Sequence, residues 1–191
     1  MNVIASNNIE LREAPSHFAW IIRKRLTIEN PVFTEAKKRN RWTGNIPQEL
    51  RFYEDTDNGL NLPRGFARQL IRLATQYEVS WQQDDRRRTL PEAGFEFTGK
   101  LRDYQQEAAR DVLKHDFGVL NAPTGSGKTI MALRIIAARK QPCLVICHSK
   151  ELLLQWIDRA CQFLNMAPDK IGIIGNGKKW IGKRLTIGIV N

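Results

Sequence analysis

Residues 122–129 read Ala-Pro-Thr-Gly-Ser-Gly-Lys-Thr, and this octet constrains the fold more than any other segment of the chain. Gly125 and Gly127 allow the backbone to wrap closely around an anion, with successive N–H groups pointing inward. From Thr129 onward the residues have the composition of a helix, whose N-terminus then lies behind the loop. The apolar run 117–121 (Phe-Gly-Val-Leu-Asn) predicts a buried strand before the loop. The sequence therefore predicts a strand, a phosphate-binding loop and a helix.

Each position of the octet has a role in such a loop. Lys128 would reach the β- and γ-phosphates of a nucleotide, and the Thr129 hydroxyl would hold Mg²⁺, so we assign these two residues to catalysis. The remaining nucleotide-binding positions are Pro123, Thr124, Gly125, Ser126 and Gly127, with Ser126 shaping the turn. The alternative is a glycine-rich turn that binds nothing, which the full match of the octet disfavours.

Charge points to a second ligand class. The chain of 191 residues has a net charge of +10 and 42% hydrophobic residues, enough apolar content for a packed core. Residues 98–191 hold 15 Lys and Arg against 7 Asp and Glu, whereas residues 1–97 hold 15 against 13. This surplus favours a polyanionic partner, most simply nucleic acid. Surface charge that only maintains solubility is the alternative.

Cysteine use and hydropathy bear on the compartment. Cys143, Cys147 and Cys161 form an odd set without metal-type spacing, which predicts buried free thiols and a reducing cytoplasm. No run approaches the ~20 apolar residues of a membrane span, and the N-terminus lacks a signal-peptide pattern. We expect a cytoplasmic protein with no membrane segment, and the oligomeric state stays open.

A change of character near Phe97 predicts a domain boundary, with a small α+β accessory domain at residues 1–97. We expect helices at 15–25, 32–39 and 64–77, the last with a buried stripe that ends at Tyr77. We expect strands at 26–28, 50–53, 60–62 and 79–82, with the second and third joined as a hairpin across 55–59, and an exposed loop at 84–91.

Three basic features of this half are candidates for DNA contact. The segment 37–44 (Lys-Lys-Arg-Asn-Arg-Trp-Thr-Gly) includes Arg41 and Trp42, a cation and an aromatic ring that can grip a phosphate and stack on a base. Arg64 opens a predicted helix, and the triplet 86–88 is all arginine. The alternatives are a core anchor for Trp42, a helix-end residue for Arg64 and a solvated loop for the triplet.

The second half alternates helices and strands. A helix begins at Leu101 with Tyr104, Ala108, Ala109 and Val112 on its apolar face. After the phosphate loop and its helix come a strand at 143–147, a helix at 149–164 and strands at 171–174 and 185–190. This order predicts a parallel sheet with right-handed crossovers.

Four segments in this order resemble the first RecA-like domain of superfamily 2 helicases, nearest to the XPB-like and UvsW-like branch. They are 101–108 (Leu-Arg-Asp-Tyr-Gln-Gln-Glu-Ala), 122–129, 147–156 (Cys-His-Ser-Lys-Glu-Leu-Leu-Leu-Gln-Trp) and 171–179 (Ile-Gly-Ile-Ile-Gly-Asn-Gly-Lys-Lys). The resemblance implies an incomplete RecA-like P-loop domain at 98–191, ATP and Mg²⁺ as cofactors, and single-stranded or branched duplex DNA as partner. Residues 30–44 and 63–65 resemble, more weakly, an N-terminal extension of some members.

The resemblance also implies roles for single residues. Gln105 corresponds to a glutamine that hydrogen-bonds the adenine edge, with Arg102 nearby, and an amide can pair with adenine's adjacent donor and acceptor. His148, Ser149 and Lys150 occupy a strand-contacting motif that usually contains Pro-Thr. Lys178 and Lys179 could hold phosphates, and residues 190–191 stand where a further strand-contacting motif would begin.

Superfamily 2 enzymes also use a Mg²⁺-binding Asp, a catalytic Glu and arginine fingers that follow later in the chain. We therefore expect these 191 residues to be a piece of a longer ATP-dependent DNA helicase or translocase of DNA repair or recombination. On their own they should bind ATP without hydrolysing it. Two alternatives stay open: the motor subunit of a restriction system, and a non-catalytic nucleic-acid-binding module.

Overall fold

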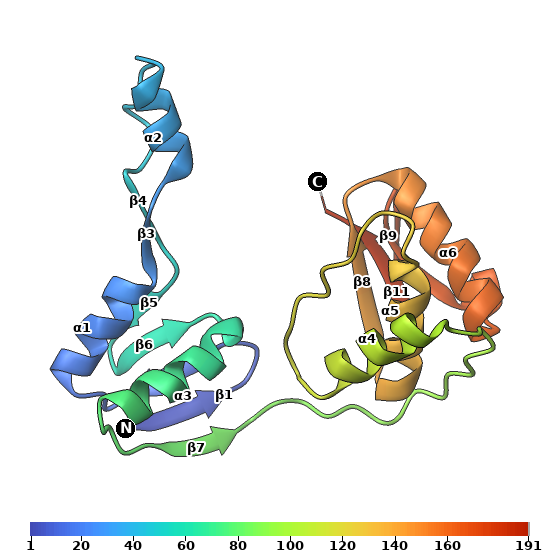
Figure 1. Cartoon of the computed structure of the whole chain (residues 1–191), viewed down its shortest axis with the longest axis horizontal. Helices are drawn as coiled ribbons and strands as arrows, with labels where there is room; N and C mark the ends of the chain where they lie inside the picture. The colour runs from blue at the N-terminus through green and yellow to red at the C-terminus, as the bar shows by residue number, and fades with distance from the viewer. Residues whose placement is uncertain (191) are drawn as a thin grey trace. The chain divides into compact units, whose positions relative to one another are not determined.

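The computed structural model describes residues 1–190, which form two compact units divided between Arg88 and Thr89 (Figure 1). This division lies earlier than the boundary expected near Phe97. The intervening stretch belongs with the second unit because the Ala93 N–H donates to the Lys140 carbonyl at 2.7 Å, and Phe95 and Phe97 pack against the second core.

The first unit contains a five-stranded sheet in the order β5-β6-β2-β1-β7. Its strands are β1 (Asn2–Ala5), β2 (Ile9–Arg12), β5 (Glu54–Thr56), β6 (Gly59–Leu62) and β7 (Gln82–Asp85). Neighbours are antiparallel except for β7, which runs parallel to β1 at the sheet edge. Side chains alternate along the strands, so Val3, Ile9, Leu11, Leu60 and Leu62 share one buried apolar face, whereas the edge strands β5 and β7 are polar.

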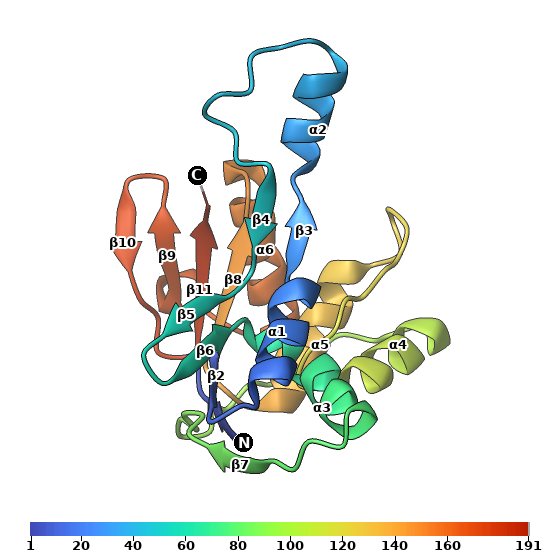
Figure 2. The same ribbon diagram turned by 90° about the vertical axis from the view of Figure 1, so that its left-hand side faces the viewer.

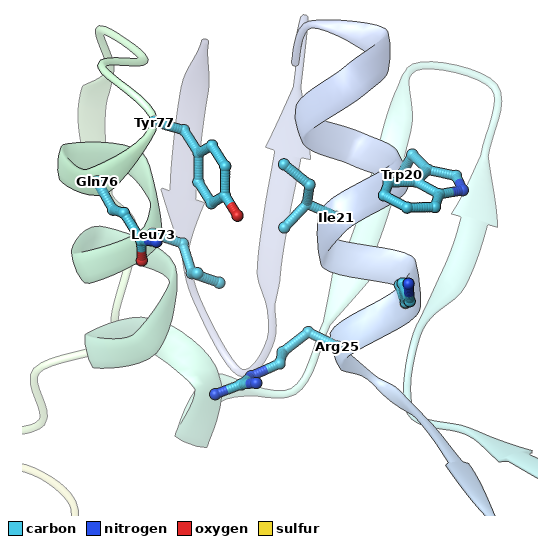
Figure 3. Close-up of a pocket in the computed structure, with 7 residues that line it drawn as sticks. Trp20, Ile21, Arg25, Leu73, Gln76 and Tyr77 are labelled. Carbon is cyan, nitrogen blue, oxygen red and sulfur yellow. The ribbon is translucent and has the colours of Figure 1, made fainter.

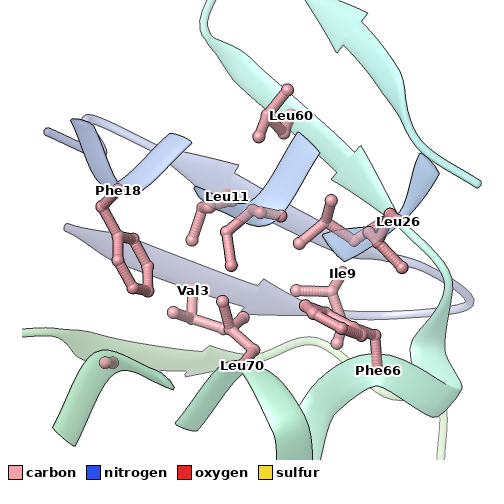
Figure 4. Close-up of a cluster of buried hydrophobic side chains, with 11 residues drawn as sticks. Val3, Ile9, Leu11, Phe18, Leu26, Leu60, Phe66 and Leu70 are labelled. Atoms are coloured by element: carbon pink, nitrogen blue, oxygen red, sulfur yellow. The ribbon is translucent and has the colours of Figure 1, made fainter. Parts of the chain in front are cut away.

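Two helices cover the apolar face of this sheet. They are α1 (Ser16–Arg25) and α3 (Ala67–Gln76), the latter preceded by the 3₁₀ turn η1 (Arg64–Phe66). Figure 4 shows Phe18 of α1 and Leu70 of α3 meeting Val3, Leu11 and other strand residues in the core. The predicted helices at 15–25 and 64–77 are confirmed, although Tyr77, expected at the end of the buried stripe, is 42% exposed.

An arm extends from the sheet of the first unit, as both Figure 1 and Figure 2 show. It consists of β3 (Thr27–Glu29), α2 (Pro31–Lys38) and β4 (Glu49–Arg51), with β3 and β4 paired as a two-stranded ribbon. Asn30 fixes the ribbon to the helix. Its side-chain oxygen accepts from the Val32 N–H at 3.0 Å, and its amide nitrogen donates to the Pro47 carbonyl at 2.7 Å.

Two strand predictions in this unit were wrong in detail. The hairpin turn at Asp57 and Asn58 exists, but it joins β6 to β5, whereas the strand expected at 50–53 is β4 and pairs with β3. The strand expected at 79–82 lies at 82–85, where it overlaps the start of the loop expected at 84–91. The position of β7 is set by its pairing with β1, which places Gln82 opposite Asn2. β7 is therefore a polar edge strand, without the alternation of apolar residues that would have marked it in the sequence.

The second unit contains a four-stranded sheet in the order β10-β9-β11-β8. β8 (Cys143–Cys147), β11 (Leu185–Ile189) and β9 (Ile171–Gly175) are parallel, and β10 (Lys178–Trp180) is an antiparallel edge strand (Figure 2). The helices are α4 (Asp103–Leu113), α5 (Lys128–Arg139) and α6 (Lys150–Leu164), with a 3₁₀ turn η2 at Pro168–Lys170. The predicted parallel α/β fold is confirmed.

The core of this unit lies between one sheet face and the helices α5 and α6. Leu133, Leu153, Ala160, Leu185 and Ile187 are almost fully buried there. On the opposite face Leu144 and Ile146 of β8 are 55% and 59% exposed. Helices α5 and α6 therefore cover one face of the sheet, and part of the opposite face is accessible at β8.

The strand expected at 117–121 was wrong. These residues pair with no strand of the described part of the chain, and Phe117 and Val119 are 45% and 93% exposed. A strand requires a neighbour for its backbone N–H and C=O groups, and apolar composition alone does not supply one. Within residues 1–190, no helix is both long and apolar enough to span a membrane.

Candidate functional site

The loop 122–127 leads directly into the first turn of α5. Gly125 and Gly127 both have a φ of +82°, a left-handed conformation that side chains disfavour. Gly127 immediately precedes Lys128, the first residue of α5. The unsatisfied N–H groups of that helix turn therefore face the loop, where the helix dipole favours an anion.

Two polar groups of the loop fit a nucleotide phosphate. The Lys128 ammonium donates to the carbonyls of Ala122 at 2.9 Å and Pro123 at 3.0 Å, two neutral acceptors that leave its charge uncompensated. The Ser126 hydroxyl is buried and has no hydrogen-bond partner among residues 1–190. Phosphate oxygens would accept from both groups and from the N–H groups of the loop. Thr129, at the second position of α5, could contribute its hydroxyl to Mg²⁺.

A pocket of about 460 Å³ lies beside the loop. It is lined by Tyr104 and Ala108 of α4, residues 120–124, Ser126, and Met131 of α5, so it includes the predicted residues Pro123 and Thr124. None of these lining residues carries a carboxylate. The pocket can therefore surround a nucleotide, but it offers no carboxylate to orient Mg²⁺ or a water molecule.

Gln105 is 6% exposed, and both ends of its amide already have protein partners. Its oxygen accepts from the Arg102 N–H at 2.9 Å, and its nitrogen donates to the Ser126 carbonyl at 2.8 Å. Gln105 thus ties the start of α4 to the phosphate loop. To read the adenine edge, as the family resemblance implies, this amide would have to exchange a partner, so the adenine contact stays a prediction, as does that of Arg102.

Tyr104 is a site residue that the sequence reasoning missed. It was placed on the apolar face of the helix at 101–113, yet it is 47% exposed. Its hydroxyl donates to the Ser126 carbonyl at 3.1 Å, the same acceptor that Gln105 uses. The sequence held one signal for this role. Tyr104 is a phenol at the first turn of an otherwise aliphatic stripe, directly before Gln105, and its hydroxyl needs a polar partner.

His148, Ser149 and Lys150, the predicted strand-contacting residues that follow β8, lie at the start of α6. Ser149 is the N-cap, and its hydroxyl accepts from the Leu152 N–H at 3.3 Å. The N–H of Glu151 and the Ser149 hydroxyl lower the pKa of the Glu151 carboxyl. His148 and Lys150 are exposed on either side. The Ser149 hydroxyl is therefore engaged in capping, whereas His148 and Lys150 are accessible to a ligand.

Lys178 and Lys179 lie on the edge strand β10 and are both exposed. Lys178 pairs with Gly175 and Lys179 with Ile174 of β9, so the two ammonium groups project from opposite faces of the sheet. One nucleic-acid strand that follows one face can contact only one of them. The structure thus separates two residues that the sequence suggested as a pair.

Trp42 lies beyond α2 at the end of the arm, with Arg41 next to it. The indole is 74% exposed, so the alternative of a core anchor is wrong. One side of the ring lies against Gly44, where an added Cβ atom would come within 2.5 Å of it. The absence of a side chain at Gly44 thus allows the ring to lie close to the backbone, while most of the indole faces solvent next to Arg41.

Arg64 is brought together with the arginine triplet. Residues 6, 7, 64 and 86–88 line a pocket of about 510 Å³ at one corner of the first unit. Arg86 pairs with Asp84 at 2.7 Å and Arg87 with Asp85 at 2.6 Å. Hydrogen bonds from the side chain and backbone of Arg87 lower the pKa of Asp85 to about 2. Four of the six residues that line this pocket are arginines and none is Asp or Glu, so its lining carries positive charge.

The second unit is similar in sequence to DNA-processing proteins. Residues 98–190 match the family described as "Type III restriction enzyme, res subunit". The "DNA 3'-5' translocase XPB2" of Sulfurisphaera tokodaii is 40% identical over 79 residues, which cover 41% of this chain and 17% of that protein. The XPB helicase/translocase subunit of general transcription and DNA repair factor IIH from Encephalitozoon cuniculi is 42% identical over 64 residues, 33% of this chain and 10% of that protein.

The fold has a solved relative that covers both units. The crystal structure of the UvsW helicase from bacteriophage T4 aligns with a TM-score of 0.65 over 99% of this chain and 75% of that chain, at 16% identity. This likeness supports the fold alone. The chain spans only a third or less of the length of the curated relatives that it matches. The ordered motifs and the sequence matches agree: residues 98–190 are similar to superfamily 2 helicases, and among them to XPB-like proteins.

Proposed function

We propose that this chain is the N-terminal part of an ATP-dependent DNA helicase or translocase, with an accessory unit followed by the nucleotide-binding part of its first motor domain. The observation that carries the proposal is the phosphate loop, in which two left-handed glycines and the Lys128 ammonium surround an anion site at the start of α5. The sequence similarity of residues 98–190 to helicases and translocases supports the same function.

The residues of the loop divide the work of binding Mg·ATP. Gly125 and Gly127 allow the N–H groups to converge on the β- and γ-phosphates, and Lys128 leaves the carbonyls of Ala122 and Pro123 to neutralise them. Thr129 holds Mg²⁺. ATP hydrolysis supplies the free energy for stepping along DNA, and the chain's own part is to hold the triphosphate in place.

We further propose that the described residues bind ATP but do not hydrolyse it. The pocket beside the loop contains no carboxylate, and residues 1–190 hold no cluster of three or more metal-ligating side chains. Phosphoryl transfer depends on positioned metal ions and stabilisation of the transition-state charge. Phosphate release by the 191-residue chain should therefore stay at background in the presence of Mg·ATP and DNA.

DNA contact falls to residues on both units. On the second unit we assign His148, Lys150 and one of Lys178 and Lys179 to phosphates of the strand, with Ser149 fixing the start of α6. On the first unit we assign Arg41 and Trp42 at the end of the arm and Arg64 in the arginine pocket. Phosphate contacts fix position without reading sequence, which suits a translocase.

The test is ATP hydrolysis by the longer protein that contains this chain. Lys128→Ala should abolish DNA-stimulated hydrolysis, because no other described cation lies in the loop. Lys100→Ala removes the same charge from an exposed position outside the pocket and should leave the rate unchanged. Undiminished DNA-stimulated hydrolysis by the Lys128→Ala protein would reject the assignment.

A non-catalytic nucleic-acid-binding module is the second candidate function, favoured by the positive arginine pocket of the first unit. It predicts tight DNA binding that falls steeply with salt and does not change when Lys128 is replaced in the longer protein. A restriction-system motor, in keeping with the description of the matching family, predicts DNA cleavage coupled to the same ATP hydrolysis. A nuclease assay on the longer protein separates it from the helicase.

A further inference from the structure

An open groove of about 580 Å³ runs between α1 and α3 in the first unit. Figure 3 shows its floor, where Ile21 of α1 and Tyr77 at the end of α3 point toward each other above Leu73. Arg25 extends from the last turn of α1 toward α3 and closes one end. Trp20 lies at the rim on α1, beyond Ile21. None of these residues takes part in the sites described above.

The two helices that form the walls carry only positive charge. α1 (Ser-His-Phe-Ala-Trp-Ile-Ile-Arg-Lys-Arg) and α3 (Ala-Arg-Gln-Leu-Ile-Arg-Leu-Ala-Thr-Gln) together hold five Lys and Arg and no Asp or Glu. In the described part of the chain no carboxylate pairs with Lys24, Arg25 or Arg72. With its amide oxygen turned toward Arg25, Gln69 accepts from Nε at 2.7 Å, and this neutral partner leaves the guanidinium charge uncompensated.

The groove also presents flat aromatic surface to solvent. Trp20 is 59% exposed, and the Lys24 ammonium lies 5.0 Å from the centre of its ring, one helical turn away. Lys24 thus covers one face of the indole and leaves the other accessible. Tyr77 is 42% exposed and is held by an edge contact with the buried Phe18 ring, 6.4 Å between centroids.

Exposed aromatic rings between uncompensated cations match an extended chain of phosphates that carries unstacked bases. An acidic peptide would satisfy the cations but would leave the aromatic faces unused, and the bases of a duplex are stacked within the helix. The volume lies in the range of roughly 300–1,000 Å³ that encloses a small ligand, which suits one or two nucleotides at a time.

We propose that the groove between α1 and α3 binds single-stranded DNA, with a base stacked on the open face of Trp20 and phosphates held by Lys24 and Arg25. The inference rests on the proposed function, which gives DNA as the substrate class. It assigns the DNA strand to a site that is separate from the proposed DNA contacts of the second unit and from the arm. The combination of aromatic platforms with a basic groove gives binding that is independent of base sequence.

The experiment measures binding of a fluorescein-labelled 12-nucleotide oligo(dT) to the 191-residue chain by anisotropy, from low to moderate salt. Trp20→Ala should weaken binding at least about fivefold with an unchanged salt dependence, since it removes stacking and no charge. Trp20→Phe should restore much of the affinity. Lys24→Ala should weaken binding and reduce the slope of log K against log salt by about 0.7, the release of one counterion from a single strand.

Arg51→Ala is the matched control, because Arg51 is exposed on β4 and does not line the groove. It should bind oligo(dT) within about twofold of the unchanged chain. Circular dichroism of every variant checks that the exposed positions 20 and 24 leave the fold intact.

The outcomes separate this inference from the function on which it rests. If the unchanged chain binds no DNA at low salt, the proposed DNA contacts fail together with the groove. If it binds oligo(dT) but both groove variants bind within twofold of it, the groove is overturned while DNA contact elsewhere survives. Equal weakening by Arg51→Ala and Lys24→Ala would also overturn it. The groove assignment would also be overturned if poly-glutamate or duplex DNA competed as effectively as unlabelled oligo(dT).

Discussion

The two glycines of the phosphate loop provide a stability test of its geometry, because they share a backbone conformation but differ in surroundings. Both have a φ of +82°, so replacement of either by alanine costs about 1–2 kcal/mol of backbone strain. A Cβ at position 125 meets no atom within 4 Å. A Cβ at position 127 would lie 2.5 Å from the Gln105 side-chain nitrogen.

That close contact fixes the size of the difference. Alanine at position 127 displaces the Gln105 amide and breaks its 2.8 Å hydrogen bond to the Ser126 carbonyl. Leaving a buried amide unpaired costs about 1–3 kcal/mol. We therefore expect Gly127→Ala to lower the free energy of unfolding by about 2–5 kcal/mol, against about 1–2 kcal/mol for Gly125→Ala.

Urea unfolding of the chain labelled with 5-fluorotryptophan measures both values. The ¹⁹F signal of Trp156 reports on the second unit, where it packs against the core, and that of Trp81 reports on the first unit as an internal control. In a Gln105→Ala background the extra cost of Gly127→Ala should disappear, a coupling of about 1–3 kcal/mol. Equal destabilisation by the two glycine variants, or no coupling to Gln105, would show that the Gln105 amide does not limit the space at position 127.

Three further predictions concern exposed or titrating groups. Arg87 holds the pKa of Asp85 in the folded chain at about 2, below its ordinary value, so their ion pair stabilises the first unit at neutral pH and is lost as the pH falls toward 2. NMR of the carboxyl groups should show this low titration midpoint for Asp85. The Asp85→Asn variant lacks the ion pair, so its acid unfolding should begin at a higher pH than that of the unchanged chain. Burial raises the pKa of the Cys143 thiol, so at pH 8 iodoacetamide should alkylate it more slowly in the folded chain than in urea, and equal rates would contradict its burial. Trp42 is 74% exposed, so Trp42→Ala should change the free energy of unfolding, measured in urea, by no more than about 0.5 kcal/mol. A larger loss of stability would show that the indole packs against the arm.

The sequence predicted what depends on local pattern. The helices that became α1, α5 and α6 have apolar stripes of helical period, and the octet at 122–129 determines its own turn through glycine, so both were located from composition and spacing. The alternation of strands and helices after residue 140 predicted the parallel order of β8, β9 and β11.

Partners distant in sequence decided the rest. The apolar run at 117–121 reads like a strand, yet no described strand supplies its ladder. β7 has a polar sequence, but β1 pairs with it. The contact of Tyr104 and Gln105 with the Ser126 carbonyl joins residues more than twenty positions apart, so the local pattern around Tyr104 could indicate a polar partner but not that this partner is Ser126.

Lys128 is proposed to hold Mg·ATP in the loop at 122–129, and equilibrium binding of the nucleotide measures this role. Titration of the 191-residue chain with a fluorescent ATP analogue and Mg²⁺ should give saturable binding. Lys128→Ala should weaken it at least tenfold, because the main cation of the loop is lost, whereas Lys100→Ala should not change it. Absence of binding by the unchanged chain, or equal binding by the Lys128→Ala variant, would contradict the claim.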